Sequence, residues 1–254
     1  MDSGFYAAVT GLVAKFDALD VAANNLANVG TTGYKAQEDF YRTFSATLGN
    51  PDAGPLNVAV NNYGVLGGAA TNLAAGPLEM TGNPLDLALQ GRGFFVVKTA
   101  AGDRYTRDGI FHVNAKHVLI TQNGDEVMGL IPKPKGKPGE GPITILPGTI
   151  TVGPSGTIAV NGSVAGQLKL VDFPKTAPLK LEGNGYYSAP AAAEAPAASP
   201  DVKQGALEAS NVNAMSEMVS LVLLQREEQM LQNAVTTFDQ GFNQTAITQI
   251  PIIQ

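Results

Sequence analysis

The 254-residue sequence contains no cysteine and no tryptophan. The absence of cysteine excludes disulfides, thiol nucleophiles, iron–sulfur clusters and thiolate zinc sites. Charged residues are scarce as well, at 15% of the chain against about 25% in an average soluble domain. A chain with so few charges has large neutral surfaces, which favours burial of much of its surface against other molecules.

Positive charge and long apolar runs are also lacking. Lys and Arg total 16 against 22 Asp and Glu, which gives a net charge of −6 and argues against a nucleic acid or an anionic membrane face as the main partner. The apolar runs are short, so we expect no membrane insertion. Because the first basic residue is Lys15, the N-terminus lacks the basic region of a cleaved signal peptide, and we expect none.

Both ends of the chain have the apolar spacing of helices. Large apolar residues recur at alternating steps of four and three, which is a heptad pattern. We expect the following seam residues to pair the two helices and to take part in subunit assembly: Phe5, Val9, Leu12, Phe16, Leu19, Leu26, Leu221, Leu224, Leu231, Val235, Phe238 and Phe242. A second apolar stripe on the C-terminal helix still needs a partner; it consists of Val212, Met215, Val219 and Val222.

The energetics of the N-terminal helix favour assembly. Burying one apolar seam does not offset the conformational entropy lost in ordering about 25 residues. We therefore expect the two ends to be mobile in the monomer and to fold on assembly. The alternative is a helical hairpin within one molecule, packed on the rest of the chain.

The middle of the chain has the pattern of β structure. Between about residues 55 and 187, Gly, Asn, Asp and Pro separate short apolar or alternating runs, as in an antiparallel sheet with tight turns. Strands and helices do not alternate, which argues against a parallel doubly wound sheet. The Lys- and Pro-rich stretch 131–142 is expected to be a loop that cannot form a central strand, and the Ala/Pro-rich stretch 189–200 an extended linker.

The predicted fold class is α+β, with discontinuous terminal heptad helices pairing as an antiparallel coiled coil and a central antiparallel all-β domain. The expected division places residues 1–33 and 207–254 in a helical domain and residues 34–75 in a connector. Residues 76–188 then form the β domain, and residues 189–206 form a linker and return.

Motifs for chemistry are weak. His112 and His117 fall on opposite faces of a regular strand, which disfavours a shared metal site. Gly91-Arg92-Gly93 lacks the third glycine of a dinucleotide fingerprint, and Ser155 lies in a turn outside any G-x-S-x-G elbow. The candidate carboxylate pairs for glycoside hydrolysis lie beside turn residues, where acids are common anyway: Asp103 with Asp108, and Asp125 with Glu126. We therefore expect no enzyme activity, no metal and no cofactor.

Three further motifs stand out. The first ends the N-terminal helix and comprises Asn24, Asn25, Leu26, Asn28, Thr32, Gly33, Tyr34 and Lys35. The second lies in the β region and comprises Thr81, Gly82, Asn83, Asp86, Gly91, Gly93, Phe94, Phe95, Thr106, Arg107 and Gly109. The third precedes the C-terminal helix and comprises Gly205, Leu207, Glu208, Ser210, Asn211 and Val212. In this order they resemble the motifs of flagellar basal-body rod and hook proteins, although residues 114–119 depart from the Asp-Gly turn that the family often has.

The resemblance implies a structural subunit of the bacterial flagellar rod, in which terminal helices form the inner tube and a β domain faces outward. Its implied partners are other rod and axial subunits and the flagellar type III export apparatus, and its implied location is the periplasmic rod. The asparagines of the first motif are expected to bond backbone groups or neighbouring subunits, or to cap the helix. Gly33 is expected to allow the chain to turn from the tube wall toward the β domain.

Within that family the length and the single β domain look most like a proximal-rod protein. A distal-rod or hook subunit is the alternative, because such proteins usually carry extra sequence that is not evident between Lys35 and Leu78. A different alternative is a secreted β-domain adhesin or glycan-binding protein. It would need an exposed aromatic groove, for which the candidates are Tyr34, Tyr41, Tyr63, Tyr105, Tyr186 and Tyr187.

Overall fold

The computed structural model describes the backbone of residues 3–45, 62–132, 138–174, 179–190, 195–196 and 201–249. Side chains are described in the same ranges except at residues 3–8, 39–45, 62–69, 195–196, 238–239 and 241–249. The chain forms two compact units. The helical unit comprises Met1–Ala27, Gln37–Ala70 and Asn213–Gln254, and the β unit comprises Asn28–Ala36 and Thr71–Val212. The α+β class is confirmed.

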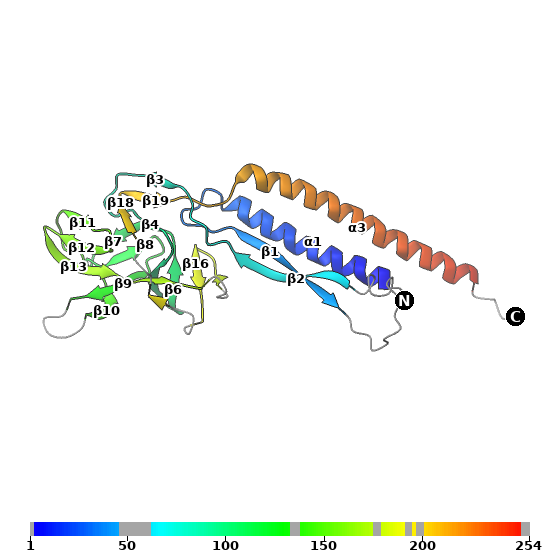
Figure 1. Ribbon diagram of the computed structural model, residues 1–254, viewed down its shortest axis with the longest axis horizontal. Helices are drawn as coiled ribbons and strands as arrows, with labels where there is room; N and C mark the ends of the chain where they lie inside the picture. Colours follow the sequence, from blue (N-terminus) through cyan, green and yellow to red (C-terminus); the bar gives the residue numbers. More distant parts are fainter. Residues whose placement is uncertain are drawn as a thin grey trace. The chain divides into compact units, whose positions relative to one another are not determined.

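Two long antiparallel helices lie side by side in the helical unit, α1 (Ser3–Ala27) and α3 (Ala214–Gln249) (Figure 1). Asn213 caps the start of α3, because its side-chain Oδ1 accepts a hydrogen bond from the N–H of Ser216 at 3.1 Å. After α1 the chain turns sharply, with Gly33 in the left-handed region at φ 68°, where glycine is favoured.

The predicted connector of residues 34–75 differs from what the structure contains. Strands β1 (Gln37–Ser45) and β2 (Asn62–Thr71) pair in a two-stranded sheet, and β1 contacts α1. The sequence of β1 includes Phe40, Tyr41, Thr43 and Phe44, which are good strand formers. Residues 37–70 therefore belong to the helical unit and do not form a separate connector.

The β unit is built from antiparallel strands, as expected. Its main sheet runs in the order β11-β12-β13-β9-β5-β6-β16-β15, and the pairs β18–β4 and β19–β3 form two small sheets. The strands are β3 (Leu78–Met80), β4 (Leu87–Gln90), β5 (Phe94–Thr99), β6 (Gly102–Thr106), β7 (Phe111–Val113), β8 (Leu119–Thr121), β9 (Glu126–Ile131), β10 (Gly139–Pro142), β11 (Ile150–Val152), β12 (Thr157–Val160), β13 (Ser163–Leu168), β14 (Leu170–Asp172), β15 (Lys180–Leu181), β16 (Tyr186–Ser188), β17 (Ala195–Pro196), β18 (Asp201–Gln204) and β19 (Ala206–Glu208).

Strand β5 separates two hydrophobic cores. Phe95 and Val97 pack in one core, where the Phe95 and Phe111 rings lie 5.1 Å apart. Phe94 and Val96 point to the opposite face and pack in the other core. Successive side chains of a strand alternate between faces, so the uninterrupted apolar run of β5 is buried on both sides.

The predicted linker and return, residues 189–206, also differs from the structure. Strand β18 pairs with β4, and its Val202 is 3% exposed in the core beside β5. Burial of this apolar residue explains why β18 pairs with β4. Residues 201–212, including the first residues of the predicted C-terminal helical segment, thus belong to the β unit. Residues 191–194 and 197–200 of the Ala/Pro-rich stretch lie outside the described part.

The Lys- and Pro-rich stretch 131–142 contains a strand at its end. Strand β10 pairs antiparallel with β9, from Gly139 opposite Ile131 to Pro142 opposite Met128. No second partner of β10 is present among the described strands, and such an edge strand tolerates proline. Residues 133–137 lie outside the described part.

Candidate functional site

Three charged side chains, one from each of the three sequence motifs, meet inside the β unit. The Glu208 carboxylate accepts hydrogen bonds from Lys35 Nζ at 2.6 Å on one oxygen and from Arg107 Nη1 at 2.9 Å on the other. The backbone N–H of Gly76 also donates to this carboxylate, at 2.8 Å. We call Lys35, Arg107 and Glu208 the buried triad.

The triad is almost completely removed from solvent. The side chains of Lys35 and Glu208 are 0% exposed and that of Arg107 is 2% exposed. Backbone carbonyls accept from both cations, since Lys35 Nζ donates to Ala74 at 2.7 Å and Arg107 Nη2 donates to Gly91 at 2.7 Å. Burial lowers the pKa of Lys35, and the hydrogen bond and charge of Glu208 oppose that shift.

Backbone contacts attach the first motif to the other two. The N–H of Gly33 donates to the carbonyl of Glu208 at 2.7 Å. A Cβ at Gly33 would lie 2.3 Å from the carbonyl carbon of Arg107, so only glycine fits. The Thr32 hydroxyl donates to Asp108 Oδ1 at 3.0 Å. Burial raises the pKa of Asp108, while hydrogen bonds from Ile110 N–H and the Thr32 hydroxyl act the other way.

Asn211 joins the two chain segments that run beside the triad. Its Oδ1 accepts from the N–H of Ala36 at 2.7 Å, and its Nδ2 donates to the carbonyls of Asn72 and Ala74, both at 3.0 Å. The Tyr187 hydroxyl accepts from the N–H of Lys35 at 3.1 Å. Burial of this hydroxyl raises the pKa of Tyr187.

Many of the other residues of the second and third motifs lie in turns or in close backbone contacts. The N–H groups of Thr81 and Gly82 donate to the carbonyl of Gly205. A Cβ at Gly109 would lie 1.6 Å from the carbonyl oxygen of Leu87. The motif residues that the structure brings together in the β unit, around the triad or in its supporting turns and cores, are Asn28, Thr32, Gly33, Tyr34, Lys35, Thr81, Gly82, Asn83, Asp86, Gly91, Gly93, Phe94, Phe95, Thr106, Arg107, Gly109, Gly205, Leu207, Glu208, Ser210, Asn211 and Val212.

The predicted seam residues are not the most buried ones of the helical unit, and their role in subunit assembly remains a prediction. The most buried of the described side chains of α1 are Ala14, Ala18, Ala22 and Asn25. The predicted seam residues Val9, Leu12, Leu19, Leu26, Leu221, Leu224, Leu231 and Val235 are only partly buried, and Phe16 is 45% exposed. The side chains of Phe5, Phe238 and Phe242 lie outside the described part. The distance between two packed helices depends on the side chains at their contact. Small side chains such as alanine allow a close approach.

Two contacts set the register of the two helices, one near the middle of α1 and one near its C-terminal end. Lys15 Nζ pairs with Glu227 at 2.6 Å, with both side chains partly exposed. Near the C-terminal end of α1, Asn25 Nδ2 donates to Glu217 Oε1 at 3.5 Å. Ten residues along α1 are therefore matched by ten residues in the opposite direction along α3.

Asn25 connects three elements of the helical unit. Its Nδ2 donates to the carbonyl of Gln37 at 2.9 Å, and its Oδ1 accepts from the N–H of Gln37 at the same distance. Of the expected roles for the motif asparagines, backbone bonding therefore applies to Asn25. The same role applies to Asn24, whose Nδ2 donates to the backbone carbonyl of Asp20 within α1 at 2.8 Å.

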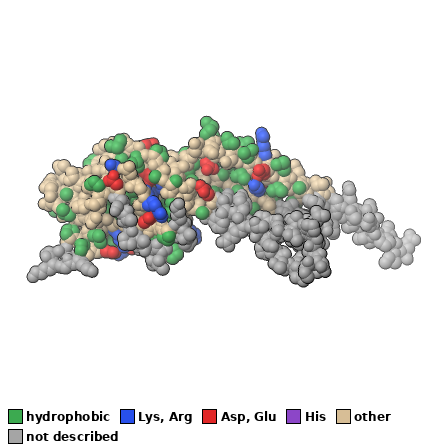
Figure 2. Space-filling view, in the orientation of Figure 1, with side chains coloured by type: hydrophobic (Ala, Val, Ile, Leu, Met, Phe, Trp, Pro, Cys, Tyr) green, Lys and Arg blue, Asp and Glu red, His purple; other side chains and the backbone are tan. Residues whose placement is uncertain are grey.

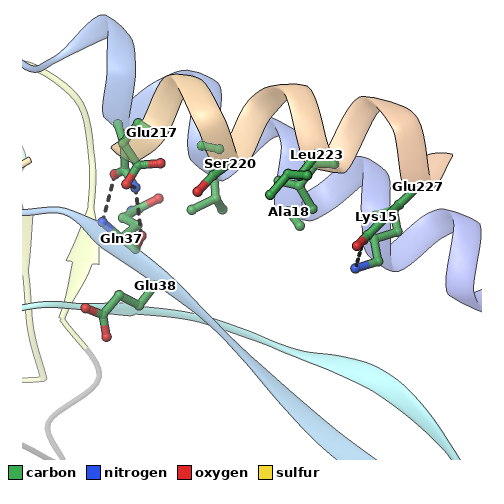
Figure 3. A pocket seen from close by; sticks show the side chains of 12 residues that line it. Lys15, Ala18, Gln37, Glu38, Glu217, Ser220, Leu223 and Glu227 are labelled. Carbon is green, nitrogen blue, oxygen red and sulfur yellow. Dashed lines mark hydrogen bonds and ion pairs between the residues drawn. The ribbon is translucent and has the colours of Figure 1, made fainter. Parts of the chain in front are cut away.

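A groove of about 410 Å³ runs between α1, α3 and β1 (Figure 3). Lys15 and Glu227 pair at one end, Glu217 and Gln37 lie at the other, and Ala18 lies between them. The complete lining is Lys15, Ala18, Val21, Ala22, Asn25, Gln37, Glu38, Glu217, Ser220, Leu223, Leu224 and Glu227.

The helical unit also has exposed apolar side chains, and Figure 2 shows hydrophobic groups on the surface of its helices. We call the exposed set on α3 the outer stripe, and it consists of Met215, Met218, Val219, Val222, Leu223 and Met230. Val13 and Phe16 of α1 are exposed as well, at 55% and 45%. Exposed apolar side chains gathered on one helix are typical of a surface that contacts another molecule.

The aromatic groove that a glycan-binding protein would need is not formed by the described tyrosines. Tyr34, Tyr105, Tyr186 and Tyr187 are all buried, and the side chains of Tyr41 and Tyr63 lie outside the described part. His112 lies on β7, whereas His117 lies in the following turn at φ 61°. Asn114 closes that turn by accepting hydrogen bonds from the N–H groups of Lys116 and Val118.

Neither a cluster of metal-binding side chains nor a membrane-spanning helix occurs among the described residues. No group of three or more His, Asp or Glu side chains described here lies close enough to bind a metal ion. No helix, as far as its residues are described, is long and apolar enough to cross a membrane.

A buried junction of motifs and an exposed apolar stripe define an assembling structural subunit. Models of flagellar families match three parts of the chain: "Flagella basal body rod protein" at residues 5–35, "Flagellar hook protein FlgE/F/G D1 domain" at residues 88–162 and "Flagellar basal body rod FlgEFG protein C-terminal" at residues 203–247. The three matches contain the three motifs in order, apart from residues 81–86.

Curated relatives cover most of the chain. The flagellar basal-body rod protein FlgF of Caulobacter vibrioides is 34% identical over 231 residues, 89% of each chain. The flagellar basal-body rod protein FlgG of Agrobacterium fabrum is 35% identical over 257 residues, 92% of this chain and 94% of its own. The FlgF protein of Rhizobium meliloti is 32% identical over 239 residues, 89% of each chain. The chain belongs to the flagellar basal-body rod protein family.

Proposed function

We propose that this protein is a structural subunit of the bacterial flagellar basal-body rod, where it polymerises with other rod and axial subunits. The outer stripe of α3 carries the proposal, because an apolar face that the subunit leaves exposed requires a partner in the assembly. Rod and hook family models match most of α1 and α3 and part of the β unit, and relatives named as rod proteins support the same conclusion.

In the assembled rod, the paired terminal helices form the tube wall as an antiparallel coiled coil, and the β unit faces outward. The subunit has no catalytic role and transmits torque from motor to hook. Neutral apolar contacts suit that task better than exposed ion pairs, which salt weakens. The chain reaches the periplasmic rod through the flagellar type III export apparatus without cleavage of a signal peptide.

The proximal rod is the proposed position within the shaft. A length close to that of the FlgF relative, with each chain covered to 89%, supports it. A distal-rod role is the alternative, because FlgG relatives match at similar identity and the segment between Lys35 and Leu78 contains β1 and β2. Replacement of each rod gene in a motile strain by the gene for this chain separates the two positions, since only the correct replacement restores motility.

Substitution of one stripe residue tests the assembly role. Val222 is 49% exposed, so Val222→Asp should leave the monomer folded while placing a charge in the subunit contact. We expect the critical concentration for polymerisation, measured by sedimentation, to rise about tenfold or more, equivalent to about 1.4 kcal/mol. The matched control is Val164→Asp on β13, because Val164 is 58% exposed in the β unit. Unchanged polymerisation of Val222→Asp would contradict the proposal.

A further inference from the structure

Asparagine followed by glycine occurs three times in the chain, at Asn123-Gly124, Asn161-Gly162 and Asn184-Gly185. In such a pair the backbone nitrogen of the glycine can attack the side-chain carbonyl carbon of the asparagine, because glycine has no Cβ to obstruct the approach. Each of the three asparagines is exposed in a turn of the β unit. The sequence and the exposure do not distinguish the pairs, but their hydrogen bonds do.

The first pair is held at both reacting groups. The N–H of Gly124, whose nitrogen would attack, donates to the carbonyl of Thr121 at 3.0 Å. The side-chain Nδ2 of Asn123 donates to the hydroxyl of Tyr186 at 3.2 Å. Both hydrogen bonds must break before the nitrogen and the amide carbon can meet, so this turn protects Asn123.

The second pair is held at the asparagine. The Oδ1 of Asn161 accepts from the N–H of Thr149 at 2.9 Å, and the N–H of Asn161 donates to the carbonyl of Thr149 at 3.0 Å. A Cβ at Gly148 would lie 2.4 Å from Asn161 Nδ2, so the amide group packs closely against the backbone at residue 148. The amide of Asn161 therefore has little freedom to rotate toward the nitrogen of Gly162.

The third pair lacks both constraints. No described residue forms a hydrogen bond with the side chain of Asn184 or with the N–H of Gly185. Asn184 is in the left-handed region at φ 52°, between Gly183 at φ 88° and Gly185 at φ 71°. Glycine is conformationally permissive, so the backbone on both sides of Asn184 can rotate to bring the attacking nitrogen to the amide carbon.

We propose that Asn184 is a site of spontaneous deamidation, at which the chain acquires an aspartate or an isoaspartate. The nitrogen of Gly185 bonds to Cγ of Asn184, the Cγ–Nδ2 bond breaks, and ammonia leaves with the amide proton of Gly185. Water then opens the cyclic imide at either carbonyl, which gives aspartate or isoaspartate. The reaction consumes one water molecule and requires no oxidant, reductant or enzyme. It does not depend on the proposed rod function, because the turn belongs to the β unit.

The site lies where a change in the main chain affects the packing of the β unit. Strand β16 begins at Tyr186, directly after the pair, and is hydrogen-bonded to β6. In the same strand the hydroxyl of Tyr187 accepts from the N–H of Lys35, a member of the buried triad, at 3.1 Å. Isoaspartate adds one carbon to the main chain of the turn, whereas aspartate adds only a negative charge at an exposed position. We therefore expect isoaspartate to weaken the attachment of β16.

Incubation of the folded full-length chain at mildly alkaline pH tests the selectivity, because hydroxide favours loss of the amide proton from the attacking nitrogen. Proteolytic digestion and mass spectrometry then give the deamidated fraction at each of the three positions. We expect deamidation at Asn184 to be about tenfold or more faster than at Asn123 and Asn161, where hydrogen bonds must open first. Equal rates at the three positions, or a faster reaction at Asn123 or Asn161, would overturn the inference.

The same chain in concentrated urea is the control for local sequence, since each asparagine precedes a glycine. Without the folded turns the three rates should agree within about threefold. If Asn184 were favoured as strongly in urea as in the folded chain, neighbouring side chains would cause the selectivity and the turn would not, which also rejects the inference.

Two variants separate the reaction from its consequence. Asn184→Gln should remove the product at this position and leave the rates at Asn123 and Asn161 unchanged, because the longer side chain must close a larger ring. Asn184→Asp carries the charge of the product on an unaltered main chain. The isoaspartate form, separated by chromatography, should unfold at a lower urea concentration than Asn184→Asp. Equal midpoints would contradict the expected effect on β16.

Discussion

The β unit and the helical unit differ in how completely they bury their side chains. In the β unit the two cores enclose both faces of β5, and even three charged side chains are buried with partners at 2.6 to 2.9 Å. In the helical unit the closest packing involves alanines, while Met215 and Met230 are 71% and 63% exposed. The β unit therefore buries its apolar and charged side chains within one molecule, whereas the helical unit leaves apolar side chains exposed for contacts that we expect with other subunits.

The largest expected effect comes from removing the anion of the buried triad. Glu208→Leu leaves Lys35 and Arg107 buried without their carboxylate partner, which should lower the free energy of unfolding of the β unit by about 3–5 kcal/mol. Urea denaturation followed by tyrosine fluorescence measures the loss.

A matched triple variant, Lys35→Met/Arg107→Met/Glu208→Leu, removes all three charges together. It should recover most of the lost stability, because apolar side chains of similar volume avoid the desolvation of unpaired charges. If the triple variant were as unstable as Glu208→Leu, the charges would not be the cause. The comparison between the units would then rest on the apolar cores alone.

An intermediate effect is expected from Asn25, a buried polar side chain of the helical unit. Asn25→Ala removes both hydrogen bonds to the backbone of Gln37 and should destabilise the helical unit by about 1–3 kcal/mol. Asn24→Ala is the control, since Asn24 is exposed and its Nδ2 donates to the carbonyl of Asp20 in its own helix. Hydrogen exchange of β1 amides in the polymerised protein reports the difference, and equal exchange in both variants would argue against a role for Asn25 in attaching β1 to α1.

The smallest effect concerns the pH dependence of the β unit. Burial raises the pKa of Asp108 above its usual 3.8, so the folded state binds more protons than the unfolded state just above that pH. The contribution of protonated Asp108 to the free energy of unfolding is fully present below pH 3.8. It is lost as pH rises through the folded-state pKa. Asp108→Asn should therefore gain stability relative to the wild type as pH increases from 3 toward 7, in urea denaturation at each pH. A constant difference between the two proteins would contradict the shift.

Sequence patterns predicted some of this architecture well and other parts poorly. The apolar run of β5 and the turn residues around it predicted an antiparallel β unit, because strand burial and turn geometry are local properties. Heptad counting predicted a seam of large residues in α1, yet Ala14, Ala18 and Ala22 occupy its most buried positions. Counting favours large apolar residues, whereas the closest approach of two helices favours small ones.

The buried triad was beyond sequence reasoning for a different reason. Lys35 and Glu208 are 173 residues apart, and only the fold brings them together. A signal existed, since each of the three motifs contains a charged residue in a chain with few charges. The sequence of residues 34–75 predicts a connector and not the strands β1 and β2, although Phe40, Tyr41 and Phe44 are typical of strands.

Amide hydrogen exchange on the full chain, dilute and then polymerised, tests the central claim most directly. The account predicts that β5 and β9 are strongly protected in both states, while α1 and α3 exchange rapidly in the dilute monomer and become protected in the polymer. Exchange in α1 and α3 of the dilute monomer as slow as that in β5 would contradict it. The helical unit would then be a closed hairpin, complete without a second copy.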